Sequence, residues 1–324
     1  MKTHRITLAP GLRRVALGAS PLSLLPMALG GSWYATDTED ADRMAAMAAA
    51  YEGGIRHFDT ASGYGQGRSE ELLGTFVSGR RTSVFIATKS HSDDLRAAAA
   101  LAQVEESLRR MRVDFIDLYY IHWPRRGRDM RPAMEGLEMA RRQGKIGAVG
   151  VSNFSVGQMQ QVAEVGRIDA HQLGYNLLWR YPERDVIPYC IANGVAVVAY
   201  SALAHGILTG KFGRDPRIPP GDQRRTILPF HPAVWPHVHA GVEQLKQLSA
   251  QEGQPLSTLA VRWLLDRPGI NSVVVGARNG AQSSANVGAL GPFISSNIFA
   301  AMTAISDDIA PHIPDAGNLF GVTF

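Results

Sequence analysis

Residues 114–122 read DFIDLYYIH, a run in which apolar side chains dominate both faces that a β-strand would present. Such near-continuous apolar runs are typical of parallel strands that are covered on both sides. Seven further runs of this kind occur along the chain. The eight predicted strands are SLLPMAL (23–29), GIRHFDT (54–60), VFIATK (84–89), DFIDLYYIH (114–122), IGAVGVSNF (146–154), DAHQLGYN (169–176), VAVVAYSAL (195–203) and NSVVVGAR (271–278).

Helical patterns fill the gaps between these runs. Met44, Met47, Ala48 and Tyr51 follow the i, i+3, i+4, i+7 spacing of one helix face, and two glycines close that segment. We interpret these stripes as core packing. Further helices are predicted at 101–111 and near 131–143, 155–165, 184–193 and 255–267.

Eight strands that alternate with helices predict a closed (β/α)8 TIM barrel, which needs about 250 residues. We expect one domain over residues 1–324, with an N-terminal extension (1–22), a long excursion between the seventh and eighth strands (204–254) and a C-terminal helical tail. An open doubly wound sheet is the structural alternative. It would carry a glycine-rich fingerprint after the first strand, and the sequence has none there.

The composition argues against several classes of protein. Of the 324 residues, 45% are hydrophobic and 19% charged, and the formal net charge is +4. We interpret the scattered arginine pairs as solvated surface, so we expect no binding of nucleic acid, which needs a concentrated basic face. These pairs are at 13–14, 80–81, 125–126 and 224–225.

Cysteine usage and apolar runs limit the protein further. The single cysteine, Cys190, excludes an internal disulfide and a thiolate metal cage. No uninterrupted apolar run approaches the roughly 18 residues that would span a membrane. Residues 13–31 resemble an export signal, but Pro21 and Pro26 interrupt the apolar stretch. We therefore predict a cytoplasmic location.

Polar residues stand at the ends of three consecutive predicted strands: Asp59, Lys89 and His122. Functional side chains of a barrel gather at the carboxyl ends of its strands, where neighbouring strands lie about 5 Å apart. Tyr64, on a glycine-rich loop, can lean over the same place. Alternation predicts two inward faces, Phe85, Ala87 and Lys89 on one strand and Ile116, Leu118, Tyr120 and His122 on the next.

These four side chains suit the protonation of an oxygen atom. A nearby ammonium favours the phenolate, so Lys89 is predicted to lower the pKa of Tyr64, with Asp59 keeping Lys89 charged. Tyr64 would then be a general acid, and His122 could donate a hydrogen bond to a carbonyl. Taken singly, Asp59 could be a helix cap, Lys89 a surface charge and His122 a core histidine. Only the set of four indicates chemistry.

The four residues, in their motifs, resemble the Asp–Tyr–Lys–His tetrad of the aldo-keto reductases. The resemblance covers about residues 50–290 and is closest to bacterial members of the branch that includes potassium-channel β subunits. The motifs occur in the family's order: FDTASGYGQGRSEELLG (58–74), IATK (86–89), DLYYIHWP (117–124), GKIGAVGVSNFS (144–155), QLGYN (172–176), VAYSAL (198–203), GILTGKF (206–212) and VVVGARNGAQSSANVGAL (273–290).

This resemblance implies an NADPH-dependent reduction of an aldehyde or ketone, with a sugar carbonyl as one candidate substrate and NADH as the alternative cofactor. Polar amides suit the carboxamide, an aromatic face suits the nicotinamide ring, and glycine-rich backbone with a lysine suits the pyrophosphate. An arginine fork suits a 2′-phosphate. The implied cofactor residues are Ser152, Asn153 and Gln172 at the carboxamide, Tyr200 under the ring, Ser201, Leu203, Gly206, Leu208, Gly210 and Lys211 along the pyrophosphate, and Gly276, Ala277, Arg278, Gln282 and Asn286 at the adenosine end.

Two departures from the family pattern bear on the cofactor. Many relatives carry a basic residue where Gln282 stands and an acid where Ala285 stands. The first change weakens strict NADPH preference, which Arg278 still favours. Trp33 and Trp123 are the predicted walls of the substrate pocket, and residues 213–240, with Trp179, are candidates to close over it. Substrate identity and oligomeric state stay open.

Two other functions are compatible with the same residues. The protein could bind NADPH mainly as a redox-sensing regulatory subunit with little turnover. Alternatively, Lys89 could form a Schiff base in an aldolase. Three histidines, His231, His237 and His239, lie close together in the sequence and suggest a metal site. On a helix, however, His237 and His239 would point away from each other, and no carboxylate is near in sequence. We therefore expect no metal.

Overall fold

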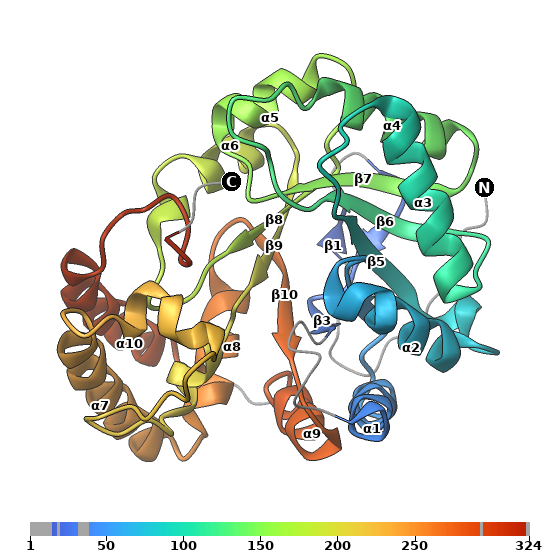
Figure 1. The fold of residues 1–324 in the computed structure, drawn as a ribbon. Helices are drawn as coiled ribbons and strands as arrows, with labels where there is room; N and C mark the ends of the chain where they lie inside the picture. Colours follow the sequence, from blue (N-terminus) through green and yellow to red (C-terminus); the bar gives the residue numbers. More distant parts are fainter. Residues whose placement is uncertain (1–14, 18–19, 32–38, 292–293, 322–324) are drawn as a thin grey trace.

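The structure is a computed structural model that describes residues 15–17, 20–31, 39–291 and 294–321. Eight parallel strands form a closed barrel in the order β10-β3-β4-β5-β6-β7-β8-β9 (Figure 1). This confirms the (β/α)8 barrel and excludes the open sheet. The barrel strands are β3 (Met27–Gly30), β4 (His57–Asp59), β5 (Phe85–Ser90), β6 (Ile116–Ile121), β7 (Ile146–Ser152), β8 (Ala170–Gly174), β9 (Ala196–Tyr200) and β10 (Ile270–Gly276).

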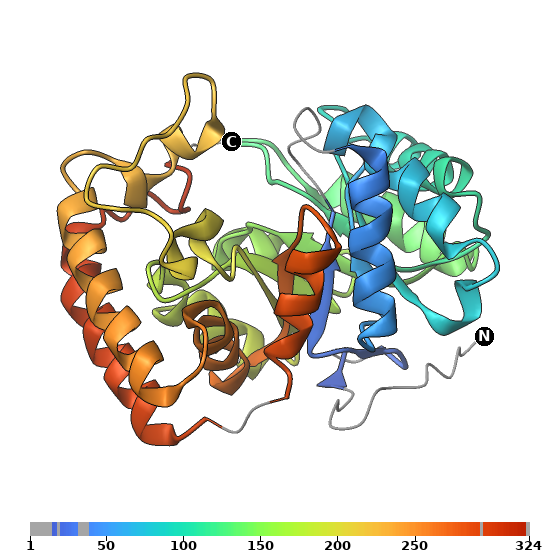
Figure 2. The ribbon, with the colours of Figure 1, turned by 90° about the horizontal axis from the view of Figure 1, so that it is seen from below.

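Helices surround the barrel, and the first and last of the ring, α1 and α9, pack side by side (Figure 2). Every helix predicted from the spacing of apolar residues is present. The helices are α1 (Asp40–Glu52), α2 (Arg68–Val77), α3 (Ala97–Met111), α4 (Arg131–Arg142), α5 (Val156–Ala163), α6 (Val186–Ala192), α7 (Trp235–Glu252), α8 (Leu256–Asp266), α9 (Gly280–Gly288) and α10 (Ser296–Ile309).

The long excursion after β9 contains α7, which the sequence analysis did not predict. Trp235, Val238, Val242 and Leu245 form its buried face. Prolines and histidines at its start conceal this spacing. Helix α7 packs against α10, which is the predicted helical tail, and the two lie together on the outside of the barrel (Figure 2).

Two apolar layers hold the barrel: one between strands and helices, and one inside the strands. The inner layer contains Phe85, Ala87, Leu118 and Tyr120, as alternation predicted. Ile116 was expected there too, but it packs in the outer layer. Space inside is limited, since a Cβ atom at Gly150 would lie 2.4 Å from the Tyr120 ring. Glycine and alanine on the neighbouring strands therefore make room for the large rings.

The N-terminal part of the first predicted strand does not belong to the barrel. Residues 23–24 form β2 (Ser23–Leu24) of a short antiparallel hairpin with β1 (Val15–Ala16), and β3 begins only at Met27. Leu17 and Leu24 of this hairpin are fully buried in the inner layer. The hairpin therefore adds to the packing inside the barrel. Among the described residues, no helix is long and apolar enough to cross a membrane.

Candidate active site

The four residues predicted at the strand ends lie together. Asp59 ends β4, Lys89 lies near the end of β5, and His122 directly follows β6. The Lys89 ammonium is 5.3 Å from the centre of the Tyr64 ring, and the Tyr64 and His122 rings are 5.7 Å apart, edge to face. The lysine and the tyrosine therefore share one end of the barrel.

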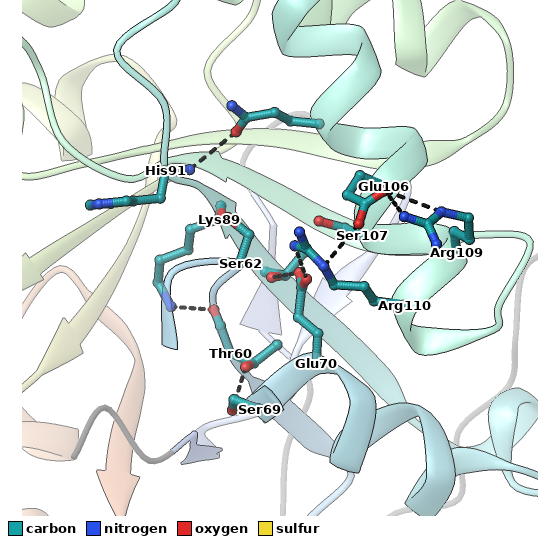
Figure 3. Close-up of polar contacts among 12 residues, drawn as sticks. Thr60, Ser62, Ser69, Glu70, Lys89, His91, Glu106, Ser107, Arg109 and Arg110 are labelled. Carbon is teal, nitrogen blue, oxygen red and sulfur yellow. Dashed lines mark hydrogen bonds and ion pairs between the residues drawn. The ribbon is translucent and has the colours of Figure 1, made fainter. Parts of the chain in front are cut away.

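Lys89 and Asp59 form a buried ion pair, with side chains 1% and 4% exposed. The Lys89 ammonium also donates to the backbone carbonyl of Thr60 at 2.7 Å (Figure 3). The second carboxylate oxygen of Asp59 accepts a 2.8 Å hydrogen bond from the Gln172 amide. Gln172, expected at the cofactor carboxamide, thus orients the ion pair. Sequence spacing gave no sign of this contact, which joins residues 113 positions apart.

Tyr64 is carried by a turn that needs an unusual backbone. In the short 3-10 helix Tyr64–Gly67, Gly65, Gln66 and Gly67 all have positive φ angles, of 56°, 54° and 95°. Glycine adopts this left-handed region without strain, which explains the glycine-rich loop. Gln66 is strained there, as is common near functional sites. The amide of Ser62 donates to the Lys89 carbonyl at 3.1 Å and ties the loop to β5.

The electrostatics correct one prediction. Burial raises the pKa of the Tyr64 phenol above its ordinary value, and the charge of Asp59 adds to this. Lys89 was expected to lower the pKa of Tyr64, but desolvation dominates. Burial also lowers the pKa of Lys89, while Asp59 opposes that shift. Tyr64 is therefore a neutral phenol in the resting site.

His122 is a neutral imidazole. Burial lowers its pKa well below the usual value, and the positive charge of Lys89 acts in the same direction. A neutral imidazole can donate one N–H to a carbonyl oxygen without adding a charge. The His122 backbone carbonyl accepts a 3.2 Å hydrogen bond from the Asn153 amide, which links β6 to β7 at the mouth of the barrel.

The residues expected around the nicotinamide form a connected group. The Tyr200 hydroxyl donates to the Asn153 side-chain oxygen at 2.7 Å, and the Asn153 amide donates to Ser152 Oγ at 3.0 Å. Asn153 and Ser201 both have positive φ angles, of 63° and 58°. Phe320 stacks on Tyr200, with ring centres 6.4 Å apart and planes 15° apart.

The segment expected to wrap the pyrophosphate is a tight turn, the 3-10 helix Ala204–Thr209. Gly206 and Gly210 have positive φ angles of 95° and 73°. A Cβ atom at Gly206 would lie 3.1 Å from Lys211 Nζ, so glycine lets the lysine cross closely above the backbone. Leu208 is fully buried and Leu203 partly, so at these positions it is chiefly the backbone that could face a phosphate.

Three cations converge beside that turn. Burial lowers the pKa of Lys211, and the charges of Arg224 and Arg278 add to the effect. Arg224 pairs with Asp222, and its side chain is only 17% exposed. Arg224 was predicted to be solvated surface, which is wrong. Arg224 lies in the long segment after β9, where few apolar residues mark a regular element, so the sequence gave no sign that its side chain is partly buried.

Two other arginine pairs also contain a partly buried member. Arg81 is 16% exposed and pairs with Asp117 at 2.8 Å, and Arg125 is 18% exposed and pairs with Asp93 at 2.7 Å. The prediction that these arginines lie on the solvated surface is therefore wrong for Arg81 and Arg125 as well. An arginine stem packs on apolar surface while its guanidinium reaches a carboxylate at the edge.

The residues expected at the adenosine end of the cofactor lie at the junction of β10 and α9. The Arg278 amide donates to the Gln282 side chain at 2.9 Å, and the Asn286 amide donates to the Gly276 carbonyl at 3.1 Å. Gln282 and Asn286 thus shape the turn that presents Arg278, which is exposed. Ala277 lines a small cavity between this turn and the end of β3.

The residues predicted to form or close the substrate pocket differ in where the structure places them. Trp33 lies outside the described residues. The ring of Trp123 is 6.2 Å from that of His122 and 6.1 Å from that of Phe320, so it does border the site. Trp179 is 2% exposed and packs 4.8 Å from the Tyr181 ring in the outer core. Phe320 was not predicted because no recognised motif or periodic apolar pattern includes this C-terminal segment.

Of the histidines considered for a metal site, His237 and His239 lie on α7, and His231 lies four residues before its start. His237 stacks on His312 of the C-terminal segment, with ring centres 3.5 Å apart. His239 lies 3.7 Å from the Glu243 carboxylate. Within the described residues, no group of three or more histidine, cysteine, aspartate or glutamate side chains could hold a metal ion.

The fold and the site define a (β/α)8-barrel oxidoreductase that acts on carbonyl groups. The chain belongs to the aldo/keto reductase family, whose sequence model matches residues 26–307. The chain is 35% identical over 279 residues to the aldo-keto reductase YhdN of Bacillus subtilis, which covers 82% of this chain and 84% of that protein. It is 28% identical over 307 residues to the NADH-specific methylglyoxal reductase of Escherichia coli, with 86% and 94% covered.

A solved structure shows the same fold. The glycerol dehydrogenase AKR11B4 of Gluconobacter oxydans superimposes with a TM-score of 0.80 and 31% identity, over 97% of this chain and 98% of that one. Aldo-keto reductases use nicotinamide cofactors and act on small carbonyl compounds. The turn Ala204–Thr209 and the cations beside it fit the phosphates of such a cofactor, because they offer close backbone and positive charge in one place.

Proposed function

We propose that this protein reduces a small aldehyde or ketone to an alcohol, with NADPH as the hydride donor and Tyr64 as the proton donor. The observation that carries the proposal is the buried Lys89–Asp59 pair against the Tyr64 ring, with neutral His122 opposite. This arrangement stabilises negative charge on the phenol oxygen after its proton has left. The bound nicotinamide would supply a hydride to the carbonyl carbon.

The raised pKa of Tyr64 is compatible with this role. A neutral phenol holds its proton until the carbonyl oxygen becomes basic during reduction. The ring of the phenolate that then forms has its centre 5.3 Å from the Lys89 ammonium, so we take about 5 Å as the separation of the two charges. At an effective dielectric of 20, this attraction is worth about 3 kcal/mol. Lys89 thus acts on the product of proton transfer, in which the charge has developed.

His122 and the aromatic rings would orient the substrate. The neutral His122 imidazole can donate to the carbonyl oxygen beside Tyr64, which fixes that oxygen at the proton donor. Trp123 and Phe320 border the same space and would limit its size. Small carbonyl compounds such as sugars, methylglyoxal and glyceraldehyde phosphates are therefore the first substrates to test.

The cofactor would lie over the other side of the mouth. Ser152 and Asn153 offer hydrogen-bonding groups for the carboxamide, and Tyr200 offers an aromatic face. Lys211 and Arg224 would hold the pyrophosphate, and the exposed Arg278 would bind a 2′-phosphate. The last contact is our reason for preferring NADPH to NADH. The cytoplasm is the compartment we propose for this activity.

The aldolase alternative is disfavoured. A Schiff base needs a neutral lysine that a substrate can reach. Lys89 is 1% exposed, ion-paired with Asp59 and hydrogen-bonded to the Thr60 carbonyl. Borohydride trapping of a carbonyl compound on Lys89 would reverse this conclusion.

The test is a screen of NADPH and NADH oxidation with sugars, aryl aldehydes, diketones, methylglyoxal and L-glyceraldehyde 3-phosphate. We expect turnover that is lost in Tyr64→Phe. Tight NADPH binding without turnover on any of these compounds would instead support the regulatory function. Equal turnover in the wild type and Tyr64→Phe would remove Tyr64 from its proposed role.

A further inference from the structure

Glu70 is a buried carboxylate that the reaction described above does not use. It is the third residue of α2 and is completely buried. Its Oε1 accepts a 2.8 Å hydrogen bond from the Thr88 hydroxyl. Its Oε2 lies 3.1 Å from the Arg110 guanidinium (Figure 3). A buried acid with both oxygens bound is a charged, fixed group.

The position of Glu70 connects it to the catalytic residues on both sides. Thr88 directly precedes Lys89 in β5, so the two side chains point to opposite faces of the strand. Lys89 points to the barrel mouth, and Thr88 points outward to Glu70. On the other side, α2 begins at Arg68, directly after the turn that carries Tyr64.

A second contact fixes the same turn of α2. The Thr60 hydroxyl donates to Ser69 Oγ at 2.7 Å, and the Thr60 carbonyl accepts from Lys89 (Figure 3). The loop of Tyr64 is therefore closed at its far end by two neighbouring residues of α2: Ser69, which contacts Thr60 directly after β4, and Glu70, which contacts Thr88 of β5. The distance between the Tyr64 ring and the Lys89 ammonium depends on this closure.

Glu70 also contributes to the electrostatics of Lys89. Its negative charge raises the pKa of Lys89, in the same direction as Asp59 and against burial. The other titratable groups around Lys89 are Tyr64 in the loop, His57 on β4 and His122 after β6. Both histidines have lowered pKa values because they are buried, so they stay neutral.

Glu70 is in turn balanced by one cation. Arg110 of α3 pairs with Glu70 and, at 3.0 Å, with Glu106, and its side chain is 27% exposed. Tyr119 of β6 lies near enough to feel the charge of Glu70 and is itself a neutral phenol, whose pKa burial raises. Removal of Glu70 therefore removes a negative charge behind β5 without exposing another acid.

We propose that Glu70 is a positioning residue that locks the Tyr64 loop to β5 through Thr88 and supplies a second buried negative charge behind Lys89. The inference rests on the proposed reductase function for its kinetic consequences. Its structural and electrostatic content does not depend on turnover.

Three substitutions separate the two parts of the proposal. Thr88→Val removes the hydrogen bond and keeps the charge. Glu70→Gln keeps an acceptor for Thr88 and removes the charge. Glu70→Asp keeps the charge on a shorter arm. Glu106→Gln is the matched control, because it removes the other carboxylate of Arg110 without touching β5.

The electrostatic part is tested on the protein without cofactor. The chain has five lysines, at positions 2, 89, 145, 211 and 246, so ¹³Cε-lysine NMR gives a short spectrum in which Lys89→Met assigns one signal. We expect the Lys89 signal to titrate at a pH lower by about half a unit or more in Glu70→Gln. We expect no shift in Glu106→Gln or Thr88→Val. An unchanged midpoint in folded Glu70→Gln would overturn this part.

The positioning part is tested by kinetics. We expect Thr88→Val and Glu70→Asp to lower kcat about three- to tenfold while the Kd for NADPH stays within twofold, since a misplaced Tyr64 slows proton transfer and leaves the cofactor site intact. Variants with reduced Tm but unchanged kcat would show that Glu70 is only structural. If the wild type reduces no carbonyl compound, the proposed function fails, and the NMR titration still decides the role of Glu70.

Discussion

Asp59→Asn is the substitution whose effects the structure defines most sharply. Asp59 is 4% exposed, and its two carboxylate oxygens bind Lys89 and Gln172. Asparagine has nearly the same shape and can still bind Gln172. The substitution therefore removes the negative charge beside Lys89 and changes little else.

Two energies follow from this geometry. Leaving one partner of a buried ion pair unpaired costs about 3–5 kcal/mol of the free energy of unfolding. In Asp59→Asn this cost is reduced if Lys89 loses its proton. Burial lowers the pKa of Lys89, and the charge of Asp59, which opposes that shift in the wild type, is gone in the variant. A neutral Lys89 no longer stabilises the Tyr64 phenolate, which removes up to about 3 kcal/mol, while the loss of the repulsion from Asp59 offsets part of this; kcat should fall by up to about 100-fold.

Urea unfolding at several pH values measures the first energy. The folded-state pKa of Lys89 lies below the unfolded value of about 10.4 and falls further in Asp59→Asn. The cost of burying the charged lysine is complete below the folded-state pKa and fades as the pH rises towards the unfolded value. The stability gap between the wild type and Asp59→Asn should therefore narrow between the folded-state pKa of Lys89 in the variant and its higher folded-state pKa in the wild type, because above the latter both proteins gain stability in parallel.

The control is Asp117→Asn, which breaks the 2.8 Å pair with Arg81 away from the site. It should lower stability without a comparable loss of kcat. A stability gap for Asp59→Asn that stays constant with pH, or a kcat near that of the wild type, would refute the role assigned to the ion pair.

Three further substitutions test other parts of the site. Tyr64→Phe should lower kcat about 1,000-fold or more while the Kd for NADPH stays within twofold by fluorescence titration, since the proton donor is lost and the cofactor contacts are not. Arg278→Ala should weaken NADPH about tenfold and NADH less than twofold, because only NADPH has a 2′-phosphate, and equal losses would contradict the assignment. Gly206→Ala should raise the Kd of both cofactors about tenfold by straining a backbone with φ of 95° beside Lys211, and unchanged calorimetric titrations would show that this turn holds no phosphate.

The sequence alone determined the barrel and predicted that the proposed catalytic residues meet at one end of it. Apolar runs with two buried faces predicted eight parallel strands, and all eight are present. Asp59, Lys89 and His122 stand at the ends of consecutive strands, so their convergence followed from strand spacing alone. The glycines around Tyr64 likewise indicated a left-handed turn, because few other residues adopt that backbone conformation.

Only the tertiary structure decided the electrostatics and the contacts between distant segments. The pKa of Tyr64 is raised and not lowered, because desolvation depends on everything that surrounds the phenol. Local patterns did not predict the contacts of three residues in the site: Gln172, Arg224 and Phe320. Gln172 reaches Asp59 from a strand on the other side of the barrel, and Arg224 and Phe320 come from segments outside the barrel strands. Local spacing records which face a side chain presents, whereas its partners and its access to water depend on how the whole chain closes around it.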